Sequence, residues 1–493
     1  MRNPEALLRT RRRGALAATV AVALLAAPPL SAETLNEALG ATYKFNPRLD
    51  AARATMRATD EEVPRALSGF RPNITGSADT AYQKNTTRTT PPAVGGTVDS
   101  NPRGYGVNLT QPIFRGFRTI NAVSEAEATV RAGRETLRST EESVLLEAVT
   151  AYMDVVRDQA IVRLRENNVT VLSRDLQATQ DRFNSGEVTR TDVAQAQARR
   201  AAGVSALDLA RANLKTSRAT FERVVGHPPS NLVEPRPTRL VPKSTNDAVE
   251  ISTREHPSVV AALYREQAAR FAVDRIRGEL LPEVSLEANY ARRFDGQPGI
   301  EESETTSVTG RVTVPFYTGG EVQARVRQAK HTHVSRLQEI EQARTEVQAQ
   351  VIAAWSQLAA ARAQIESDQA QVEANRIALT GVREEEKVGQ RTLLDVLNAQ
   401  QELLNSEVNL VTTRRNLVVA SYQVLSTIGR LNAQELGVSA LVYDAEANYH
   451  EVRRKWFDIN ITHRDGRRET LEAIGPQDDL SPAAPASPPT PGR

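Results

Sequence analysis

The sequence of 493 residues predicts an α+β fold in which β-hairpins alternate with very long coiled-coil helices, arranged as two tandem structural repeats. Three observations predict it. Similar segments recur at an offset of first 210 and then 203 residues, each copy contains alternating apolar and polar residues of the strand type, and each continues into a long heptad stretch without proline. Aromatic residues form only 4% of the chain, which is typical of long helices rather than a compact mixed domain.

Composition and charge exclude several classes of protein. The chain contains no Cys, which excludes disulfide-stapled folds, zinc fingers, thiol catalysis and thiolate metal sites. The first 32 residues contain five Arg and one Glu, a net charge of +4, so the formal charge of +2 becomes −2 without them. A chain so close to neutral offers no basic stripe for nucleic acid.

The first 32 residues read as an export signal. Arginines from Arg9 to Arg13 precede a short apolar run from Ala15 to Ala27, and small residues follow up to Ala32. This order is that of a secretory signal peptide cleaved after Ala32. The alternative is a cytoplasmic protein with a basic tail. The apolar run is too short to span a bilayer.

The repeats are visible as matched residues. Asn46-Pro47 and His256-Pro257 lie 210 residues apart, whereas Gln111-Pro112 and Val314-Pro315 lie 203 apart, so the first copy holds seven extra residues between Pro72 and Pro112. The predicted organisation is a signal peptide 1–32, repeat one 33–230, a linker or equatorial region 231–245, repeat two 246–430, an equatorial C-terminal region 431–475 and a disordered tail 476–493 rich in Pro, Ala and Ser.

Each repeat begins with a helix and then a β-hairpin, at 73–114 in the first copy and 283–317 in the second. Apolar residues alternate with polar ones, as in Val308, Val312 and Phe316, which is the period of a strand with one apolar face. Aromatic residues gather towards the strand ends, as in membrane β-barrels, although an ordinary half-buried sheet is the alternative. The predicted strands are 73–84, 104–114, 283–294 and 307–317, with polar loops at 85–103 and 295–306.

A long helix follows each hairpin. Residues 113–227 and 316–475 contain no proline, which helix interiors exclude at about 3 kcal/mol each. Apolar residues recur every seven positions, which predicts coiled-coil packing. A helix from about 117 to 183 would be roughly 100 Å long. Two heptad lines run through each copy. In the first copy they are Val123, Val130, Leu137, Val144 and Ala151, followed by Ala148, Val155, Val162, Val169 and Leu176. In the second copy they are Val326, His333, Ile340, Val347 and Ala354, followed by Val351, Leu358, Ile365, Val372 and Leu379.

Each long helix ends in a tip turn, at 184–190 and 387–391, before a shorter helix. Gly186 and Gly389 suit left-handed caps. Thr189 with Asp192, and Thr392 with Asp395, have the spacing of a helix N-terminal capping box. Capping alone is one explanation of both aspartates.

Four membrane-type strands do not close a barrel, which needs eight or more strands and no open edge in lipid. Three chains would supply twelve strands and so close it. We therefore expect a homotrimer with a twelve-stranded transmembrane β-barrel, continued by a helical barrel.

The chain resembles the TolC-type outer-membrane channel family of efflux and type I secretion systems over about residues 33–435. The two-copy order, the hairpin exits QPIFRG (111–116) and VPFYTGG (314–320), and the tip segments NSGEVTRTDVAQAQ (184–197) and KVGQRTLLDVLNAQ (387–400) support the resemblance. It implies an outer-membrane trimer with a periplasmic helical extension, bound to a periplasmic adaptor (membrane fusion) protein and an inner-membrane transporter, either ABC-type or proton-driven. It implies no cofactor.

The resemblance also gives the tips a role as a gate. Asp395 matches the family's aspartate ring at the entrance, and carboxylates around a three-fold axis would select cations. The family often has a second aspartate one turn on, where this chain has Asn398. Arg391 matches a latch arginine that bonds to a neighbouring tip at positions matching Thr191 and Asp192. Glu386 replaces the family's tyrosine partner and is expected to attract Arg391.

We therefore predict a non-enzymatic exit duct in the outer membrane, because no catalytic triad, phosphate loop or paired catalytic carboxylate is present. His331 and His333 do not share a helix face, so a metal site there is not expected. The segment YDAEANYHEVRRKWFD (443–458) resembles protein-secretion members and favours type I secretion. The alternatives are drug or metal efflux, and, from another class, a periplasmic coiled-coil scaffold without a pore.

Overall fold

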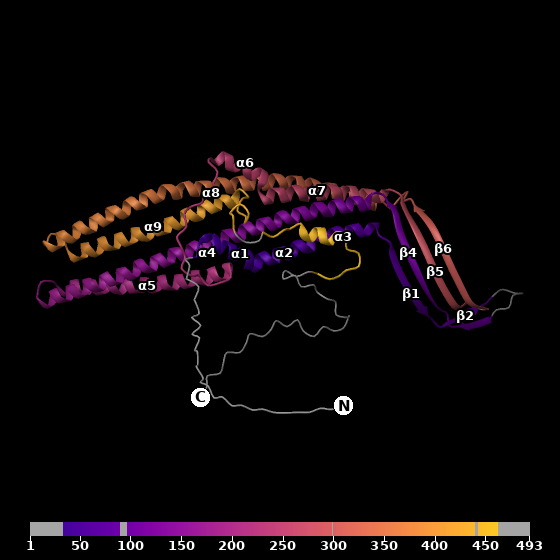
Figure 1. Cartoon of the computed structure of the whole chain (residues 1–493), viewed down its shortest axis with the longest axis horizontal. Helices are drawn as coiled ribbons and strands as arrows, with labels where there is room; N and C mark the ends of the chain where they lie inside the picture. The colour runs from indigo at the N-terminus through magenta and orange to yellow at the C-terminus, as the bar shows by residue number, and fades with distance from the viewer. Residues whose placement is uncertain (1–32, 89–95, 298, 439–441, 462–493) are drawn as a thin grey trace, which may run out of the picture.

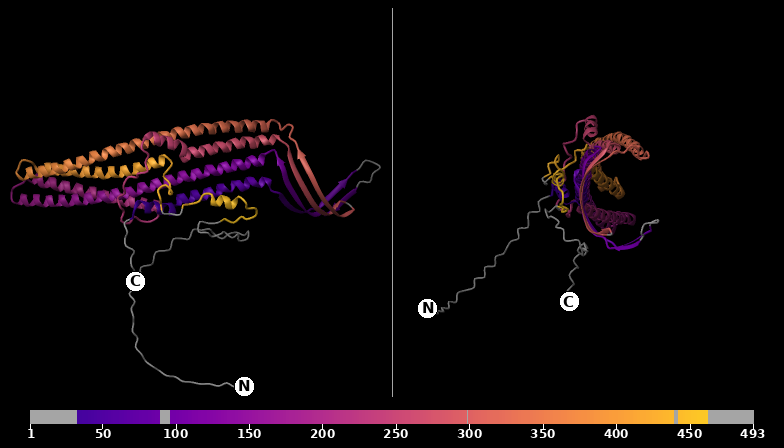
Figure 2. Two further views of the ribbon diagram at one scale, coloured as in Figure 1. Left: turned by 45° about the horizontal axis from the view of Figure 1, so that its top comes forward. Right: turned by 90° about the vertical axis from the view of Figure 1, so that its right-hand side faces the viewer.

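The computed structural model describes residues 33–88, 96–297, 299–438 and 442–461. The molecule is elongated, with a β-sheet at one end and helices that run from it to two helical tips at the other end (Figure 1). Seen from the sheet end, sheet and helices follow one curved wall, and residues 442–461 lie on its convex side (Figure 2). The predicted signal peptide and the predicted tail lie outside the described residues.

The first half of the chain begins with short capped helices that lead into the sheet. The side chain of Asn46 caps α2 by accepting from the amides of Arg48 and Leu49, with Pro47 in the first helical position. Its elements are α1 (Leu35–Phe45), α2 (Pro47–Asp60), α3 (Glu62–Leu67), the short 3₁₀ helix η1 (Ser68–Phe70), β1 (Asn73–Thr80), β2 (Gln83–Thr87), β3 (Gly96–Ser100), β4 (Arg103–Arg115), α4 (Arg118–Asn184) and α5 (Arg190–Val225).

The second half repeats the order of helix, antiparallel strands, long helix and shorter helix. His256 caps α7 as Asn46 caps α2, again before a proline. Its elements are α6 (Thr245–Glu255), α7 (Pro257–Arg277), η2 (Gly278–Leu280), β5 (Glu283–Gln297), β6 (Ile300–Thr313), α8 (Glu321–Lys387), α9 (Leu393–Thr427) and α10 (Ala447–Val452).

The main sheet is antiparallel with the strand order β1-β4-β5-β6, so strands from both halves of the chain share it. One difference from the sequence prediction is that the expected loop 295–306 is mostly strand, because β6 begins at Ile300 and pairs with β5 from there. The expected loop 85–103 likewise contains β2 and β3, which pair as a second small sheet. Threonine-rich polar segments favour extended backbone, and these strands lack the apolar alternation by which we identified the others.

The helices α4 and α8 contain 67 residues each, about 100 Å, where the sequence predicts such a helix. α4 packs against α5, α7 and α9, and α8 against α7 and α9. None of the described helices has an apolar stretch long enough to cross a membrane. The predicted heptad lines supply much of the buried surface: Val130, Leu137, Val144, Ala151, Ala148, Val155 and Val162 on α4, and Ile340, Val347, Ala354, Val351, Leu358, Val372 and Leu379 on α8 are buried.

The main apolar core lies at mid-length, where α1 and the linker between the halves pack against α4. Tyr152 of α4 is fully buried, and its hydroxyl, which has one proton to donate, lies 2.8 Å from the carbonyl oxygen of Glu33 and 2.7 Å from that of Val233. The same hydroxyl accepts from the amide of Val233 at 3.0 Å. One side chain thus ties the N-terminal segment and the linker to the long helix.

The junction between strands and helices is tight. A Cβ at Gly116, whose φ is +57°, would lie 2.2 Å from the carbonyl oxygen of Gly278. Only glycine allows this approach, which brings the exit of β4 against the turn before β5. The sheet is therefore fixed to the helices at a defined level.

Candidate functional site

The two helical tips are built in the same way. α4 and α8 end before glycines in the left-handed region, Gly186 at φ +82° and Gly389 at φ +78°. A side chain at either position would be strained, so glycine sets both turns. Thr189 and Thr392 then take extended backbone and cap α5 and α9. The glycine and threonine positions predicted from the sequence therefore form the turns.

Both tip aspartates complete capping boxes. Asp192 Oδ2 accepts from the amide (2.9 Å) and the hydroxyl (2.7 Å) of Thr189. Asp395 Oδ2 accepts from the amide (3.0 Å) and the hydroxyl (2.8 Å) of Thr392. These hydrogen bonds lower the pKa of both carboxyls below the ordinary value of 3.8. Each aspartate is thus a fixed, ionised group on an exposed tip.

Within one chain, Glu386 and Arg391 do not pair with each other. The Nε of Arg391 donates to Glu385 at 2.9 Å, whereas Glu386 accepts from Arg182 of the other tip at 2.7 Å. Successive residues of a helix point about 100° apart, so Glu385 and Glu386 face different partners. Within the described residues, Arg391 forms no ion pair with Asp192, and Thr191 is exposed.

Asn398 is also engaged across the tips. Its Oδ1 accepts from Arg199 of α5 at 2.6 Å. Together with the Arg182–Glu386 pair, this bond joins the hairpin α4/α5 to the hairpin α8/α9. These inter-hairpin links were not predicted, because the paired residues lie about 200 positions apart and no local pattern identifies them.

Two further polar links join the hairpins, one just beyond Asn398 and one further along the helices. Gln400 of α9 donates to Asp175 of α4 at 2.8 Å, and Arg415 of α9 donates to Asp154 of α4 at 2.9 Å. All four links are polar, and the two nearest the tips are exposed to solvent. Exposed ion pairs contribute little free energy, so these two links hold the tips of the two hairpins together only weakly.

The sheet has one apolar face that no described helix covers. Cross-strand partners on this face include Ile74, Leu109, Ala288 and Val308 in one row and Val107 with Tyr290 in the next. Ile74 is 62% exposed and Val308 70% exposed. An apolar surface of this extent is unfavourable in water.

The other face of the sheet is polar. Its rows pair Thr110 with Glu287 and Asn108 with Asn289, and Arg311 forms a bidentate ion pair with Glu287 at 2.8 and 2.9 Å. A sheet that is apolar on one face and polar on the other has the pattern of a barrel wall between lipid and a water-filled lumen. β1 and β6 are the two edges of the sheet within the chain.

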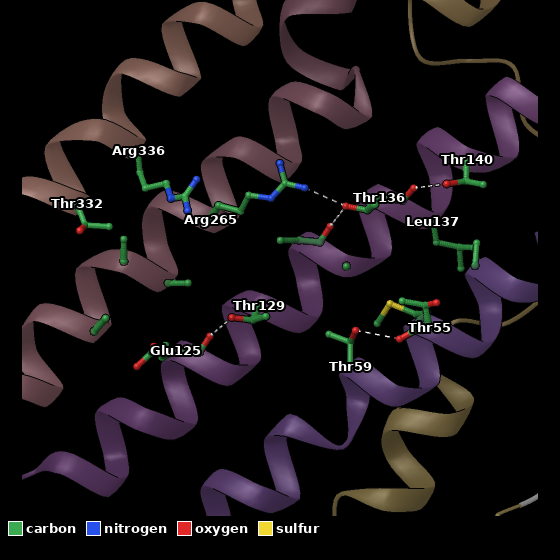
Figure 3. Close-up of a pocket in the computed structure, with 17 residues that line it drawn as sticks. Thr55, Thr59, Glu125, Thr129, Thr136, Leu137, Thr140, Arg265, Thr332 and Arg336 are labelled. Carbon is green, nitrogen blue, oxygen red and sulfur yellow. Dashed lines mark hydrogen bonds between the residues drawn. The ribbon is translucent and has the colours of Figure 1, made fainter. Parts of the chain in front are cut away.

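A cleft of about 670 Å³ lies among α2, α4, α7 and α8. Figure 3 shows its lining, in which Arg265 donates to the hydroxyl of Thr136 at 3.2 Å. Its threonines are Thr55, Thr59, Thr129, Thr136, Thr140 and Thr332. Glu125 and Thr136 line the cleft, whereas Glu127 and Arg134 bond to the C-terminal segment on the convex side. Residues two apart on a helix point in nearly opposite directions, so the cleft opens on the concave side.

No group of three or more His, Asp or Glu gathers in a metal-binding arrangement among the described residues. His333 lies 2.6 Å from Glu266 of α7.

The chain matches the family model described as outer membrane efflux protein, over residues 39–227 and 249–430. It is 39% identical to the outer membrane efflux protein BepC of Brucella suis, over 88% of this chain and 93% of that protein. It is 24% identical to the outer membrane protein TolC of Vibrio cholerae, over 82% and 92%. It is 25% identical to the alkaline protease secretion protein AprF of Pseudomonas aeruginosa, over 68% and 71%.

A solved structure shows the same fold. The Campylobacter jejuni CmeC outer membrane channel aligns with a TM-score of 0.74 at 18% identity, over 85% of this chain and 89% of that chain. Together the family model and the similar proteins confirm the predicted resemblance to the TolC-type family.

Proposed function

The chain belongs to the outer membrane efflux protein family, and on that basis we propose that three copies form the exit duct of a tripartite export system. It is an outer-membrane channel component rather than an enzyme. The observation that best supports the trimeric duct is the uncovered apolar face of the main sheet, together with its two open edges.

The dimensions of the sheet fit a membrane. Between Val284 and Phe294 the strand β5 covers ten residue steps, about 33 Å along the strand. With the tilt of about 40° usual in barrels, this gives a height of about 25 Å, the apolar band of an outer-membrane barrel. Open strand edges are not tolerated in lipid, so β6 of one chain must pair with β1 of the next. Three chains of four strands then close a twelve-stranded barrel.

The helices form the rest of the duct. The concave side of the wall, with the threonine cleft, faces the lumen, and the helical tips extend into the periplasm. We interpret the two similar halves of the chain as tandem repeats, 33–230 and 246–430. In this arrangement each chain supplies about one third of the wall.

The tips form the gate. Around the three-fold axis, three copies of Asp395 make a ring of carboxylates, with Asn398 one turn further on, and such a ring favours cations. The latch is a contact between chains, in which Arg391 exchanges its partner Glu385 for Thr191 and Asp192 of a neighbouring tip. Arg182–Glu386 and Arg199–Asn398 add restraints within each chain.

The partners are two further copies of this chain, a periplasmic adaptor protein, an inner-membrane transporter and outer-membrane lipid. The cargo that we propose is protein, as the similarity to the alkaline protease secretion protein AprF and the 443–458 segment suggest. Small-molecule efflux is the second candidate, because the efflux protein BepC is the more similar of the two relatives. Deletion of the gene, followed by measurement of secreted proteins and of drug susceptibility, separates them.

Pairing between chains can be tested by cross-linking, since the chain contains no native Cys. Gly76 on β1 and Gly310 on β6 lie on the two edge strands, and a Cβ at either position meets nothing within 4 Å. We expect Gly76→Cys combined with Cys at one of residues 306, 308 or 310 to form covalent trimers. Gly76→Cys with Val107→Cys is the matched control, because these two residues pair within one chain and should give cross-linked monomers.

A stable monomer in detergent, with no cross-linking from β1 to any β6 position, would contradict the trimer. The pore is tested separately in planar bilayers. Stepwise conductance is expected from purified trimers. Trimers without conductance would instead favour the scaffold.

A further inference from the structure

The C-terminal segment 453–461 follows α10 on the convex side of the wall, running a short way towards the sheet before it turns back (Figure 1). The guanidinium of Arg71 lies over the ring of Trp456, 4.7 Å from its centroid. Arg71 ends η1 and stands two residues before β1 begins at Asn73. Trp456 is therefore held at the level where the helices give way to the strands.

Most of the apolar side chains of this segment are exposed. Phe457 is 91% exposed, Ile459 68%, Trp456 58% and Ile461 54%. The rings of Trp456 and Phe457 lie 6.2 Å apart. Four large apolar side chains within six residues are costly to leave in water, and tryptophan prefers the boundary between lipid and water.

Basic residues precede the aromatic pair. Lys455 forms an ion pair with Glu451 at 3.0 Å, and Arg453 with Glu127 of α4 at 3.1 Å. Arg454 between them is exposed. Basic side chains beside exposed aromatic ones are the combination that binds the phosphates and the upper acyl region of a phospholipid surface.

The segment follows the ordered helix α10, so the fold sets its depth relative to the strands. Asn448 of α10 donates to the buried Asp60 of α2 at 2.8 Å. Val452 is 3% exposed, and the guanidinium groups of Arg134 and Arg453 lie over the ring of Tyr449, 5.3 and 5.6 Å from its centroid. The exposed residues extend from this ordered base rather than from a free chain.

We propose that residues 453–461 are a membrane-surface anchor outside the barrel, in which Trp456, Phe457, Ile459 and Ile461 enter the phospholipid layer on the helix side of the outer membrane. Arg454 then meets lipid phosphate. The occupant is lipid rather than a second copy, because the segment lies on the convex side, with Trp456 level with the start of strands that have an uncovered apolar face. The anchor rests on the proposed function, since it requires that the sheet spans the membrane.

Tryptophan fluorescence tests this proposal in the full mature chain. The chain contains two tryptophans, Trp355 at the mid-length core and Trp456. In Trp355→Phe trimers reconstituted in phospholipid vesicles, Trp456 is the only reporter. We expect its emission to shift to shorter wavelength on transfer from detergent-free amphipol to vesicles, and to be quenched at least twofold by lipids brominated near the headgroup. Trp456→Phe trimers are the matched control, and Trp355 emission should not respond to brominated lipid.

The outcomes separate this anchor from the proposed function. One outcome is that the vesicles conduct, acrylamide still quenches Trp456 and brominated lipid does not. This result would overturn the anchor and leave the proposed channel function standing. Trp456 shielded from acrylamide yet unquenched by the lipid would assign the segment to a protein surface and also overturn it. If the trimers neither insert nor conduct, both proposals fail. In a second test, Phe457→Ser with Ile459→Ser should reduce quenching of Trp456 and leave single-channel conductance unchanged.

Discussion

At the scale of single residues, Asp395 has two physical roles that substitution can separate. Its carboxylate caps α9 through Thr392, and its charge would line the entrance. Asparagine retains an oxygen that accepts from the Thr392 amide and removes the charge. We expect Asp395→Asn to lower the cation selectivity of trimers, measured as the reversal potential in a salt gradient, and to weaken block by multivalent cations. Thermal stability should change little.

The matched control for this prediction is Asp192→Asn, because Asp192 completes the same capping box in the other tip. If both variants shift the reversal potential equally, both tips line the entrance. An unchanged reversal potential in Asp395→Asn would leave capping as the whole role of this residue.

Arg391 is the second residue whose role the structure sharpens. Within the chain it pairs with Glu385, so the proposed latch to Asp192 of a neighbouring chain requires an exchange of partners. We expect Arg391→Ser to raise conductance and the open fraction of isolated trimers, and Asp192→Ala to give part of the same effect. The double variant should add less than the sum, since both changes remove one contact.

Glu385→Gln distinguishes the two partners of Arg391. If the latch is between chains, this variant leaves the open fraction unchanged or lowers it, because it frees Arg391 for Asp192. A rise equal to that of Arg391→Ser would instead identify the pair within the chain as the restraint.

At the scale of elements, the two helical hairpins are joined near the tips by exposed polar links. Arg182–Glu386 and Arg199–Asn398 are the outermost. We expect Arg182→Ala with Arg199→Ala to increase conductance, with a smaller increase at high salt, where the ion pair is already screened. Arg211→Ala is the matched control, because Arg211 pairs with Glu166 at 2.8 Å inside one hairpin. Equal conductance in the double variant and the wild type would show that these links do not restrain the tips.

The linker between the halves depends on one buried hydroxyl. Tyr152→Phe removes its bonds to Glu33 and Val233, although the Val233 amide still donates to the Glu33 carbonyl oxygen at 3.2 Å. We therefore expect a loss of about 0.5–1.5 kcal/mol in the free energy of unfolding, the net contribution of a typical hydrogen bond, measured by denaturant titration. Tyr422→Phe on α9 is a control of similar size. A loss below that of Tyr422→Phe would mean that water or a relaxed linker replaces the hydroxyl.

The elements also show what the sequence reveals and what it does not. The long helices and the apolar strand faces have strong periods, so Val144 or Val308 can be assigned to a buried line or to an apolar strand face from position alone. β2, β3 and the outer part of β6 are polar strands without such a period, and their pairing depends on neighbours in space. The pairing of Glu386 with Arg182 rather than Arg391 also depends on the relative rotation of two helices, which no local pattern encodes.

At the scale of the whole molecule, the chain is one segment of the trimeric wall that we propose. Its apolar sheet face, open strand edges and concave cleft would each be completed by neighbouring copies. The tips, where we propose the gate, already have ordered charges within one chain. We infer that assembly brings pre-formed tips together, so that the gate depends on weak contacts between chains rather than on folding.

The two halves of the chain meet at mid-length around a buried acidic group, which gives the last prediction. Glu142 of α4 is 3% exposed, beside Arg138, Glu141 and Glu135. Arg138 donates to the carbonyl oxygen of Gly429, at the end of α9, at 2.8 Å. Burial raises the pKa of Glu142 from 4.5 to about 9, so the folded chain holds a proton there that the unfolded chain releases.

The direction of the pH dependence follows from linkage. Between pH 4.5 and 9 the folded state binds the extra proton at Glu142, so stability falls as pH rises. Burial lowers the pKa of His256 from 6.5 to about 4, so its contribution rises with pH in that window and opposes Glu142. Above pH 6.5 only the fall in stability caused by Glu142 remains, and the free energy of unfolding decreases by up to about 1.4 kcal/mol per pH unit. We expect Glu142→Gln to flatten the decline in unfolding free energy between pH 6.5 and 9, whereas the exposed control Glu166→Gln retains it. Equal slopes in Glu142→Gln and the wild type would show that Glu142 is ionised in the folded chain, with Arg138 offsetting the cost of its burial.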